Sequence, residues 1–434
     1  MIIIKEGSNI VNDQIQTGFF DRYRLSNFVI KETLNIGYLL YNTLNGYLVY
    51  VNDTYDLLSS MPDLIKLYYY IRIDFDEYEL VRKIRIKELK KNKNINRYTI
   101  FTTTNCNAQC FYCYEKGLPV VMMSEDTAYD VANYIISNSC SKNQILRWFG
   151  GEPLLNVKAI NIISKQLQEY KINFRSRMIT NGVLFNEKLV KNAINLWNLK
   201  KVQITLDGTK DVYQNSKSFK NSKGDEFDKV IRNIEYLIDS KINVNIRLNQ
   251  DLYNTNDLFS LVDFFTQRIG CSKYLRIYNS LLYDSQNTQE IEGKRYEEFL
   301  LLQSVLINRG FYPLRPLSGV IKTVHCMADS DNAVTITPLG EIGKCEHYIN
   351  EYMIGSIYDK KINLDVQNNW KKTLKEHDKC FSCPLYPQCL RIIMCPEEKE
   401  FCSLVQCENK IYLIKLVMKK IYKRFVNNKK SGIV

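Results

Sequence analysis

The chain has 434 residues, more than one ordinary domain needs, and therefore predicts two or three domains. Hydrophobic residues make up 45% of it, enough for buried cores, yet no run of about eighteen apolar residues predicts a membrane-spanning helix. The net charge of +12 would suit an acidic partner, but basic residues are spread out and no nucleic-acid-binding motif is present. We expect neither nucleic acid nor membrane as a partner.

The N-terminus and the cysteines indicate the compartment and the kind of chemistry. The opening residues MIIIKEGSN lack the basic start, apolar run and cleavage site of a signal peptide, which predicts a cytoplasmic protein. In that compartment, thirteen cysteines favour metal binding over disulfide bonds. Three lie between Cys106 and Cys113 and eight between Cys326 and Cys407, whereas Cys140 and Cys271 stand alone and are interpreted as buried hydrophobic residues.

Residues 1–95 predict a small, separate α+β unit without any of the clustered cysteines. Strand-like runs lie around 28–30 and 38–41, and Asn45-Gly46 is a strong hairpin-turn signal. Helical patterns follow around residues 55–60, 64–70 and 77–89.

Residues 96–315 alternate between strand and helix patterns. Six such pairs imply a parallel sheet with right-handed crossovers. The predicted strands are 98–104, 145–149, 174–179, 201–206, 243–248 and 274–278. The predicted helices are 124–138, 157–170, 186–197, 226–240, 255–268 and 290–308.

The segment after the first of these strands holds Cys106, Cys110 and Cys113, with the spacing C-x3-C-x2-C. Three thiolates this close can bind three corners of one cubic iron–sulfur cluster and leave the fourth iron open to a small molecule. The alternative is a zinc knuckle or three unrelated thiols. Zinc prefers four ligands, however, and no second knuckle or histidine lies nearby.

Further polar residues follow the next strands, at the edge where barrel enzymes place their chemistry. Gly150 and Gly151 let the backbone approach a ligand closely, and Glu152 beside them can accept from an ammonium group. Arg247, on the fifth strand, can form a bidentate pair with a carboxylate. For Arg247, and for Asp207 after the fourth strand, the alternative is a structural ion pair or a turn residue.

The region 316–412 is rich in cysteine, and residues 413–434 predict a short basic helix and tail. A zinc ribbon on Cys380 and Cys383 would leave too many of the region's thiols without a role. The cysteines of this region are Cys326, Cys345, Cys380, Cys383, Cys389, Cys395, Cys402 and Cys407.

The spacing C-x3-C-x-aromatic-C, with Tyr112 before the third cysteine, resembles the signature of the radical SAM enzymes. The resemblance implies an open, partial (β/α)6 barrel in an α/β fold, and a [4Fe–4S] cluster whose open iron binds S-adenosylmethionine (SAM). One electron then cleaves SAM and yields a 5′-deoxyadenosyl radical that abstracts a hydrogen atom. The motif Gly150-Gly151-Glu152-Pro153 is similar to the family's GGEP segment, which binds the SAM amino group.

Two further strand-end segments strengthen the resemblance. Thr180-Asn181-Gly182 is similar to the segment that lies near the ribose of SAM. Thr205-Leu206-Asp207-Gly208 resembles the S-x-D-G segment of peptide-modifying members, which makes Asp207 the candidate catalytic residue.

The C-terminal cysteine pattern resembles the SPASM domain, which carries two auxiliary [4Fe–4S] clusters. By that resemblance Cys326, Cys345 and Cys395 hold the first cluster. Cys380, Cys383 and Cys389 hold the second, with Cys402 or Cys407 as fourth ligand. Two features depart from the usual pattern: five residues instead of three separate Cys389 from Cys395, and one cysteine too many follows. The surplus cysteine can instead complete the first cluster.

Together these resemblances imply a peptide maturase that installs a thioether or carbon–carbon crosslink in a ribosomally synthesised precursor peptide. A flavodoxin or ferredoxin would supply electrons, and the auxiliary clusters would carry the excess electron away. Residues 1–95 resemble winged-helix precursor-recognition domains, or else form an extension that only packs on the barrel. The alternatives are a sulfatase-maturating enzyme that makes formylglycine, a peptide epimerase, or a non-catalytic iron–sulfur scaffold.

Overall fold

A computed structural model of the chain divides into two compact units. Unit 1 comprises Met1–Asn92, Pro313–His325 and Lys372–Val434, and unit 2 comprises Lys93–Tyr312 and Cys326–Lys371. The structure describes residues 1–8, 22–89, 94–139, 143–282, 289–312, 317, 319, 321–323, 327–328, 330–347, 352–359, 362–370, 378–389 and 404–430.

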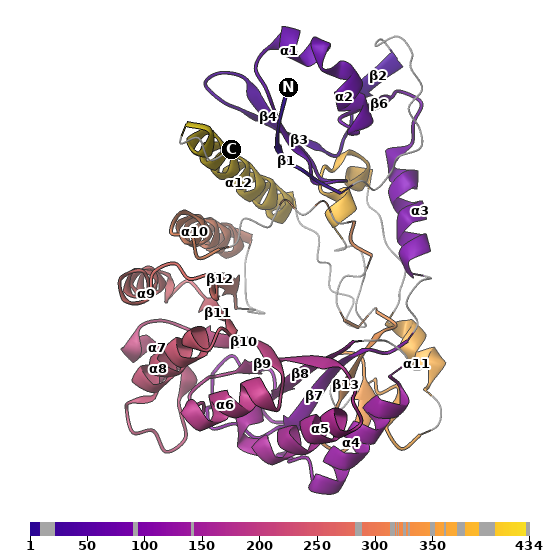
Figure 1. Ribbon diagram of the computed structural model, residues 1–434. Helices are drawn as coiled ribbons and strands as arrows, with labels where there is room; N and C mark the ends of the chain where they lie inside the picture. Colours follow the sequence, from indigo (N-terminus) through magenta and orange to yellow (C-terminus); the bar gives the residue numbers. More distant parts are fainter. Residues whose placement is uncertain are drawn as a thin grey trace. The chain divides into compact units, whose positions relative to one another are not determined.

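Unit 2 is built on an open, mostly parallel sheet (Figure 1). Within the described residues the strand order is β12-β11-β10-β9-β8-β7-β13-β14-β15, and β7 to β12 run parallel in chain order. The six parallel strands are β7 (Arg97–Thr103), β8 (Gln144–Gly150), β9 (Phe174–Thr180), β10 (Leu199–Leu206), β11 (Asn243–Gln250) and β12 (Leu275–Leu281).

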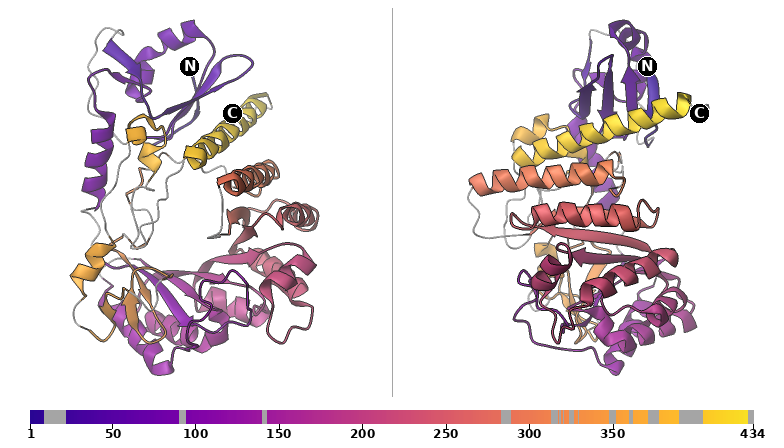
Figure 2. Two further views of the ribbon diagram at one scale, coloured as in Figure 1. Left: turned by 180° about the vertical axis from the view of Figure 1, so that it is seen from behind. Right: turned by 90° about the vertical axis from the view of Figure 1, so that its left-hand side faces the viewer.

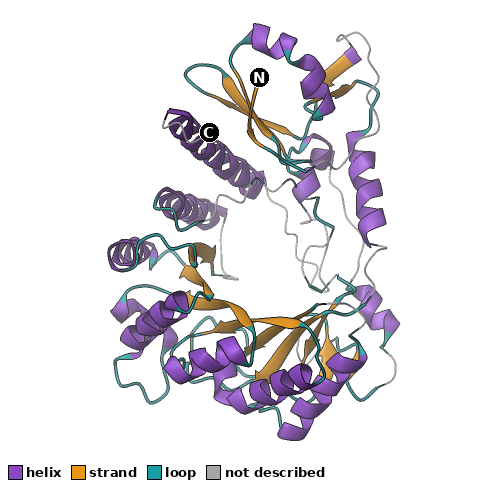
Figure 3. Cartoon of the chain, viewed as in Figure 1, coloured by secondary structure: helices purple, strands orange, loops and turns teal. Residues whose placement is uncertain are grey.

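A helix follows each parallel strand, and these helices cover one face of the sheet (Figures 1 and 3). The predicted α/β fold with six strand–helix pairs is confirmed, with boundaries that differ by at most three residues. The helix α7 (Lys210–Lys217) and the strands β13 to β15 were not predicted. The helices are α4 (Glu125–Ser137), α5 (Val157–Glu169), α6 (Glu187–Asn195), α7, α8 (Glu226–Asp239), α9 (Thr255–Arg268) and α10 (Gln289–Asn308).

The three additional strands extend the sheet beyond β7. β13 (Ala333–Ile336) pairs parallel with β7, and β14 (Glu341–Gly343) and β15 (Gly355–Ser356) continue antiparallel. They come from the region predicted to carry auxiliary clusters, so part of that region completes the barrel sheet. The short helix α11 (Leu364–Asn369) follows them.

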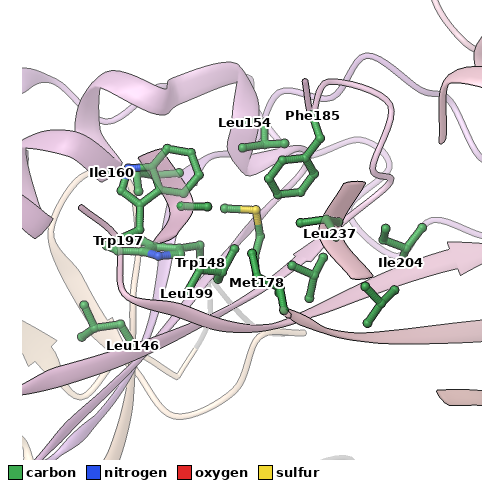
Figure 4. Close-up of a cluster of buried hydrophobic side chains, with 14 of the residues drawn as sticks. Leu146, Trp148, Leu154, Ile160, Met178, Phe185, Trp197, Leu199, Ile204 and Leu237 are labelled. Atoms are coloured by element: carbon green, nitrogen blue, oxygen red, sulfur yellow. The ribbon is translucent and has the colours of Figure 1, made fainter. Parts of the chain in front are cut away.

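The main core of unit 2 lies between the sheet and its helices. Successive strand side chains point to opposite faces, so every second residue faces the helices. Leu146 and Trp148 of β8 and Met178 of β9 do so, and they pack with Trp197 and Ile160 (Figure 4). The strand residues that alternate with these face the opposite side of the sheet, here called the inner face. The polar strand ends converge on that side.

Unit 1 contains a four-stranded antiparallel sheet in the order β1-β5-β4-β3. The predicted Asn45-Gly46 turn joins β4 to β5, as a hairpin signal should. The sheet strands are β1 (Ile2–Lys5), β3 (Val29–Thr33), β4 (Tyr38–Asn42) and β5 (Leu48–Val51). A two-stranded sheet of β2 (Tyr23–Leu25) and β6 (Tyr70–Arg72) and the helices α1 (Thr54–Ser59), α2 (Met61–Lys66) and α3 (Glu77–Leu89) complete its N-terminal part.

The C-terminal Cys380–Cys389 segment packs onto this N-terminal part. Tyr386 stacks on Phe28 and packs edge to face against Tyr78, and all three rings are buried. Gln388 donates to the Tyr41 hydroxyl at 2.9 Å and to the Thr43 carbonyl at 2.8 Å. The domain limits 1–95, 96–315, 316–412 and 413–434 stay a prediction; these contacts place parts of the first and third segments in one unit.

The C-terminal helix also belongs to unit 1. α12 (Leu404–Lys430) covers most of the predicted basic tail as one long helix (Figure 2). Its Lys415 and Lys419 pair with Glu32 on β3, at 3.4 and 2.5 Å, and Tyr422 stacks on Tyr50. Within the described residues, none of the helices is both long and apolar enough to cross a bilayer.

Arg85 on α3 binds the C-terminal segment most directly. Its buried guanidinium donates to the carbonyls of Tyr386 at 2.6 Å, Cys389 at 2.9 Å and Lys322 at 3.1 Å. Hydrogen bonds from charged donors contribute roughly 1.5–3 kcal/mol each, without strict additivity. We therefore expect Arg85→Met to lower the free energy of unfolding of unit 1 by roughly 2–4 kcal/mol.

Urea unfolding of the iron-free protein measures this change. The control is Lys83→Met on the same helix, because Lys83 is exposed and only reaches Glu79 at 3.8 Å. Equal stabilities of the two variants would contradict the assigned role of Arg85.

Candidate active site

Cys106, Cys110 and Cys113 lie in the loop that leaves the carboxyl end of β7. All three thiols are free and half-buried. A turn from the Cys110 carbonyl to the Cys113 amide, 3.2 Å, brings these two residues together, and the Cys106 sulfur accepts from the Ala108 amide at 3.4 Å. The loop is thus folded around its cysteines by its own backbone.

Gly150 and Gly151 allow the start of this loop to lie against the end of β8. A Cβ atom on Gly150 would stand 2.0 Å from the Thr103 carbonyl oxygen, and one on Gly151 would stand 2.3 Å from that of Asn105. The φ of Gly150 is +119°, in a region that side-chain-bearing residues rarely adopt. The amides of Gly151 and Glu152 donate to those two carbonyls at 3.1 and 2.8 Å. In this structure, the glycines position the cysteine loop.

Glu152 joins the ends of β8 and β9. Its fully buried carboxylate accepts from the Thr180 hydroxyl at 2.8 Å, the Asn181 amide at 2.8 Å and the Leu154 amide at 3.1 Å. Burial raises the pKa of Glu152 to about 7, although these hydrogen bonds act in the opposite direction. A carboxylate has about four acceptor positions, so three donors leave room for one more.

The cysteine loop also forms hydrogen bonds with residues that follow β9 and with the end of α7. Asn181 donates to the Asn107 side chain at 2.7 Å, and the Lys220 amide donates to the Asn107 carbonyl at 2.8 Å. The Gln109 amide donates to the Lys217 carbonyl at 2.9 Å, at the end of α7. The ends of β9 and α7 therefore support the chain between Cys106 and Cys110.

Tyr112 ties the loop to a buried polar network under the ends of β10 and β11. Its hydroxyl donates to the Asp207 carboxylate at 2.9 Å and accepts from Lys217 Nζ at 2.7 Å and Asn249 Nδ2 at 3.0 Å. Lys217 and Asp207 form an ion pair of 3.2 Å, and each side chain is only 2% exposed. Asn254 donates to the Asp207 carbonyl at 2.8 Å.

The charges of this network stabilise one another. Burial disfavours the ammonium form of Lys217, but the facing Asp207 carboxylate and Cys110 outweigh burial, so the pKa of Lys217 is raised. Burial, and next the negative charge of Asp207, raise the pKa of Tyr112 well above its ordinary range. A neutral phenol therefore lies between a carboxylate and an ammonium group, and the loop is locked by charged hydrogen bonds.

Arg247 lies on the inner face of β11, two residues before Asn249. Its Nη2 donates to the Ser280 hydroxyl at 3.1 Å, whereas its buried Nε has no hydrogen-bond partner among the residues that the structure describes. An unpaired buried donor costs free energy unless a ligand supplies an acceptor. This orphan donor fits an anionic group such as the SAM carboxylate.

The three loop cysteines also fit a cluster. Burial raises the pKa of the Cys106 thiol to about 12, so a metal must displace its proton on binding. In the described part of the chain, no three Cys, His, Asp or Glu side chains converge to surround a single ion. A [4Fe–4S] cluster does not require this, because each cysteine binds a different iron.

The predicted auxiliary ligands are only partly described. Cys380, Cys383 and Cys389 lie in consecutive turns closed by backbone bonds of 3.1–3.2 Å, all within unit 1. Cys345 follows β14 in unit 2. Cys326, Cys395 and Cys402 lie outside the described residues, as does Cys140, and of Cys407 only the helical backbone in α12 is described.

The interpretation of Cys271 as a buried residue is wrong. Its side chain is exposed and its thiol donates to the Arg309 carbonyl at 2.9 Å, because it lies in the loop between α9 and β12. Lys217 and Asn254 were not predicted as parts of the site. Lys217 carries no local signal, since its partners are reached only when α7 folds back onto the sheet.

Comparisons with known proteins agree with this architecture. The description Radical SAM superfamily matches residues 100–255. The chain is 22% identical to the radical SAM cyclopropyl synthase TigE of Paramaledivibacter caminithermalis, over 82% of this chain and 79% of that protein. It is 25% identical to a cysteine-type anaerobic sulfatase-maturating enzyme of Clostridium novyi, over 66% and 84%. It is 30% identical to a GTP 3′,8-cyclase of Clostridium acetobutylicum, over 59% and 83%.

Two solved structures share the fold. Native anSMEcpe with bound AdoMet and Kp18Cys peptide gives a TM-score of 0.58 at 16% identity, over 76% of this chain and 99% of that one. Streptococcus suis SuiB bound to precursor peptide SuiA gives a TM-score of 0.50 at 14% identity, over 88% of this chain and 96% of that one.

Removing the ammonium group of Lys217 should destabilise unit 2. Lys217→Met leaves the Asp207 carboxylate buried without its counter-ion, which costs roughly 3–5 kcal/mol. The double variant Lys217→Met, Asp207→Asn should recover part of this loss, because the uncompensated charge is gone. Urea unfolding of the iron-free variants tests both expectations.

The control for this experiment is Lys210→Met, which removes an exposed pair with Asp228 of 2.8 Å from the same helix. Such pairs contribute about 1 kcal/mol or less. A Lys217→Met variant as stable as this control would disprove the proposed role of the buried pair.

Glu152 should make stability depend on pH. Its folded pKa of about 7 lies above the ordinary 4.5, so folding favours the neutral form. Relative to Glu152→Gln, the wild type should lose up to roughly 3 kcal/mol of stability as the pH rises from about 4.5 to 7, with no further change above.

Unfolding of the iron-free proteins at several pH values measures this difference, with the exposed Glu169→Gln variant as control. If Glu152 did not have the raised pKa, the difference between the unfolding free energies of the wild type and Glu152→Gln would stay constant over this pH range.

Proposed function

Because this chain belongs to the radical SAM superfamily, we propose that it is a peptide maturase that oxidatively modifies a ribosomally made peptide. The modification we propose is a thioether or carbon–carbon crosslink. As a radical SAM enzyme the protein uses a [4Fe–4S] cluster and SAM. When bound, these supply a radical that abstracts a hydrogen atom from the substrate.

One observation carries this proposal: a complete set of strand-end residues in unit 2 occurs together with the folded Cys380–Cys389 segment in unit 1. The relatives support it. TigE is named a cyclopropyl synthase and extends over 82% of this chain, whereas the GTP 3′,8-cyclase extends over 59%. The solved structures with this fold contain bound peptides.

In the proposal, different residues of unit 2 bind the cluster, the SAM amino group and the SAM carboxylate. Cys106, Cys110 and Cys113 would bind the cluster, and Tyr112 holds their loop. The free acceptor position of Glu152 would receive the SAM amino group, and the orphan Nε of Arg247 would donate to its carboxylate.

Asn181 and Asp207 complete this assignment. Asn181 would lie near the ribose, since it follows β9 beside the cysteine loop. The catalytic role of Asp207 stays a prediction, and its contacts with Lys217 and Tyr112 are those of an ion pair that positions the loop. The Lys217–Asp207 pair thus supports the loop that carries the proposed cluster cysteines.

The C-terminal cysteines would hold the auxiliary clusters. We assign Cys380, Cys383 and Cys389 to one cluster, with Cys402 or Cys407 as fourth ligand. Cys345 would bind the other, with Cys326 and Cys395. An oxidative crosslink leaves one electron on the product, and these clusters would give it a path to a flavodoxin or ferredoxin, the class of partner that also supplies the electron for SAM cleavage.

The N-terminal sheet of unit 1 offers a place for a leader peptide. β1 is an edge strand that pairs only with β5 within the described residues, and its Ile2 and Ile3 are 41% and 42% exposed. Added peptide strands bind such edges through main-chain hydrogen bonds. We therefore include leader recognition by residues 1–95 in the proposal.

A sulfatase-maturating activity is the second candidate. The Clostridium novyi relative carries that name and the match extends over 84% of its length. Such an enzyme would oxidise one Cys or Ser to formylglycine and would not crosslink its substrate. A peptide epimerase is a further alternative, whose product would keep the mass of its substrate.

The test uses the full chain, reconstituted with iron and sulfide, reduced, and incubated with SAM and each short peptide encoded beside its gene. Mass spectrometry should show a peptide that has lost two hydrogens, and fragmentation should locate the crosslink. An aldehyde at a Cys or Ser position would favour the second candidate. No change in any peptide mass, with SAM cleaved, would reject the proposed oxidation.

The two sets of cysteines should separate SAM cleavage from peptide modification. Replacing Cys106, Cys110 and Cys113 by Ala should abolish deoxyadenosine formation. Replacing Cys380, Cys383 and Cys389 by Ala should remove about four irons of roughly twelve, keep deoxyadenosine formation and yield little modified peptide. Circular dichroism serves as the control that each variant is folded.

Iron analysis, chromatography of deoxyadenosine and peptide mass spectrometry give the three readouts. SAM cleavage by the first variant would refute the assignment of its cluster. Normal peptide product from the second would show that its cysteines are structural only.

A further inference from the structure

The inner face of the unit 2 sheet carries a cluster of arginines near the amino ends of three strands. Arg97 lies on β7, Arg147 on β8, and Arg175 and Arg177 on β9; together these four residues are the inner arginine cluster. Their neighbours along each strand, Tyr98, Leu146 and Met178, pack in the helix-covered core. Because strand residues alternate between faces, all four arginines share the inner face.

The sheet register brings these charges close together. Arg147 is paired directly with Arg177, and Ile145, which is paired with Arg97, is also paired with Arg175. Paired side chains on adjacent strands have Cβ atoms about 5 Å apart, and like charges at that distance are destabilising. Burial first, and then the charges of Arg147, Arg175 and Arg97, lower the pKa of Arg177.

Within the described ranges, one ion pair offsets the positive charge of this cluster. Glu346, in the segment after β14, pairs with Arg147 at 3.5 Å. Across the described ranges, the guanidinium groups of Arg97, Arg175 and Arg177 have no hydrogen-bond or ion-pair partner. Among the described residues, Glu346 is the one carboxylate that forms an ion pair with these four arginines.

An apolar patch lies next to the cluster on the same face, one step closer to the cysteine loop. Phe101 of β7 and Phe149 of β8 pack edge to face with centroids 4.9 Å apart, and Leu118 and Ile179 contact them. Phe149 and Ile179 each follow an arginine of the cluster by two residues. The inner face therefore presents, in order, the cysteine loop, an apolar patch and a basic region.

We propose that the inner arginine cluster binds carboxylate side chains of the peptide substrate, so that the preferred substrate is acidic near its modified residue. This inference rests on the proposed peptide-maturase function. Guanidinium groups bind carboxylates in a planar, bidentate way, and a substrate carboxylate would offset the mutual repulsion described above. The adjacent apolar patch suits the hydrophobic side chains of such a peptide.

The test measures binding of a short fluorescein-labelled peptide of alternating Gly and Glu to the reconstituted full chain by fluorescence anisotropy. The Gly-Gln peptide is the uncharged control. Arg147→Gln combined with Arg177→Gln should weaken binding of the acidic peptide about tenfold or more, because two of the guanidinium groups that would bind its carboxylates are lost. Arg232→Gln, an exposed change on α8, should leave binding as in the wild type.

Three results would overturn the inference: equal affinity of the wild type for the Glu and Gln peptides, unchanged affinity in the double variant, or an equal loss in Arg232→Gln. Thermal unfolding shows that the double variant is folded, which removing mutual repulsion should favour.

Failure of this inference differs from failure of the proposed function. An unchanged binding constant in the double variant rejects the inference even when the enzyme still oxidises a peptide. Binding that depends on the arginines, with no peptide oxidised, rejects the proposed function but keeps the basic site as a binding site for acidic peptides.

Discussion

The buried ion pair of Lys217 and Asp207, bridged by Tyr112, is the interaction on which the candidate active site depends. It connects four pieces of chain: the cysteine loop, the end of β10, the end of β11 through Asn249, and the end of α7. A charge this deeply buried is tolerated only when it is paired and hydrogen-bonded. The loop therefore has one favourable position, in which the Tyr112 hydroxyl is inserted between the two charges.

The other contacts of the loop act in the same direction. Gly150 and Gly151 leave room for the backbone of Thr103 and Asn105 to lie where a side chain would collide with it. Asn181 donates a hydrogen bond to the side chain of Asn107. A cluster with an open iron needs such a framework, because the ligand and the substrate must be placed accurately relative to it. Two groups near the framework still have capacity for a ligand: the carboxylate of Glu152 and the buried Nε of Arg247.

In unit 1, the position of the C-terminal cysteine segment depends on residues near the N-terminus of the chain. The Cys380–Cys389 segment is held against the rest of the unit by Arg85, Tyr41 and the aromatic group of Phe28 and Tyr78. These partners precede it by some three hundred residues. Contacts of such sequence separation form late in folding, because loop closure must come first. The docking of the C-terminal cysteine segment therefore depends on long-range contacts with the N-terminal part of unit 1.

The sequence by itself determined the local features of this protein. Alternating and helical hydrophobic patterns located six strands and six helices of unit 2, but not α7 or β13 to β15, because burial on one face imposes a period of two or 3.6 residues. Short-range spacing also identified the loop of Cys106, Cys110 and Cys113 and the Asn45-Gly46 turn, since their chemistry depends on neighbours along the chain.

Only the tertiary structure decided which distant residues meet. Lys217 joins Asp207, the Cys380–Cys389 segment packs on α3, β13 extends the sheet at β7, and four arginines of three strands share one face. None of these contacts leaves a periodic trace in the sequence, because each is set by sheet register and by chain reversal rather than by local conformation.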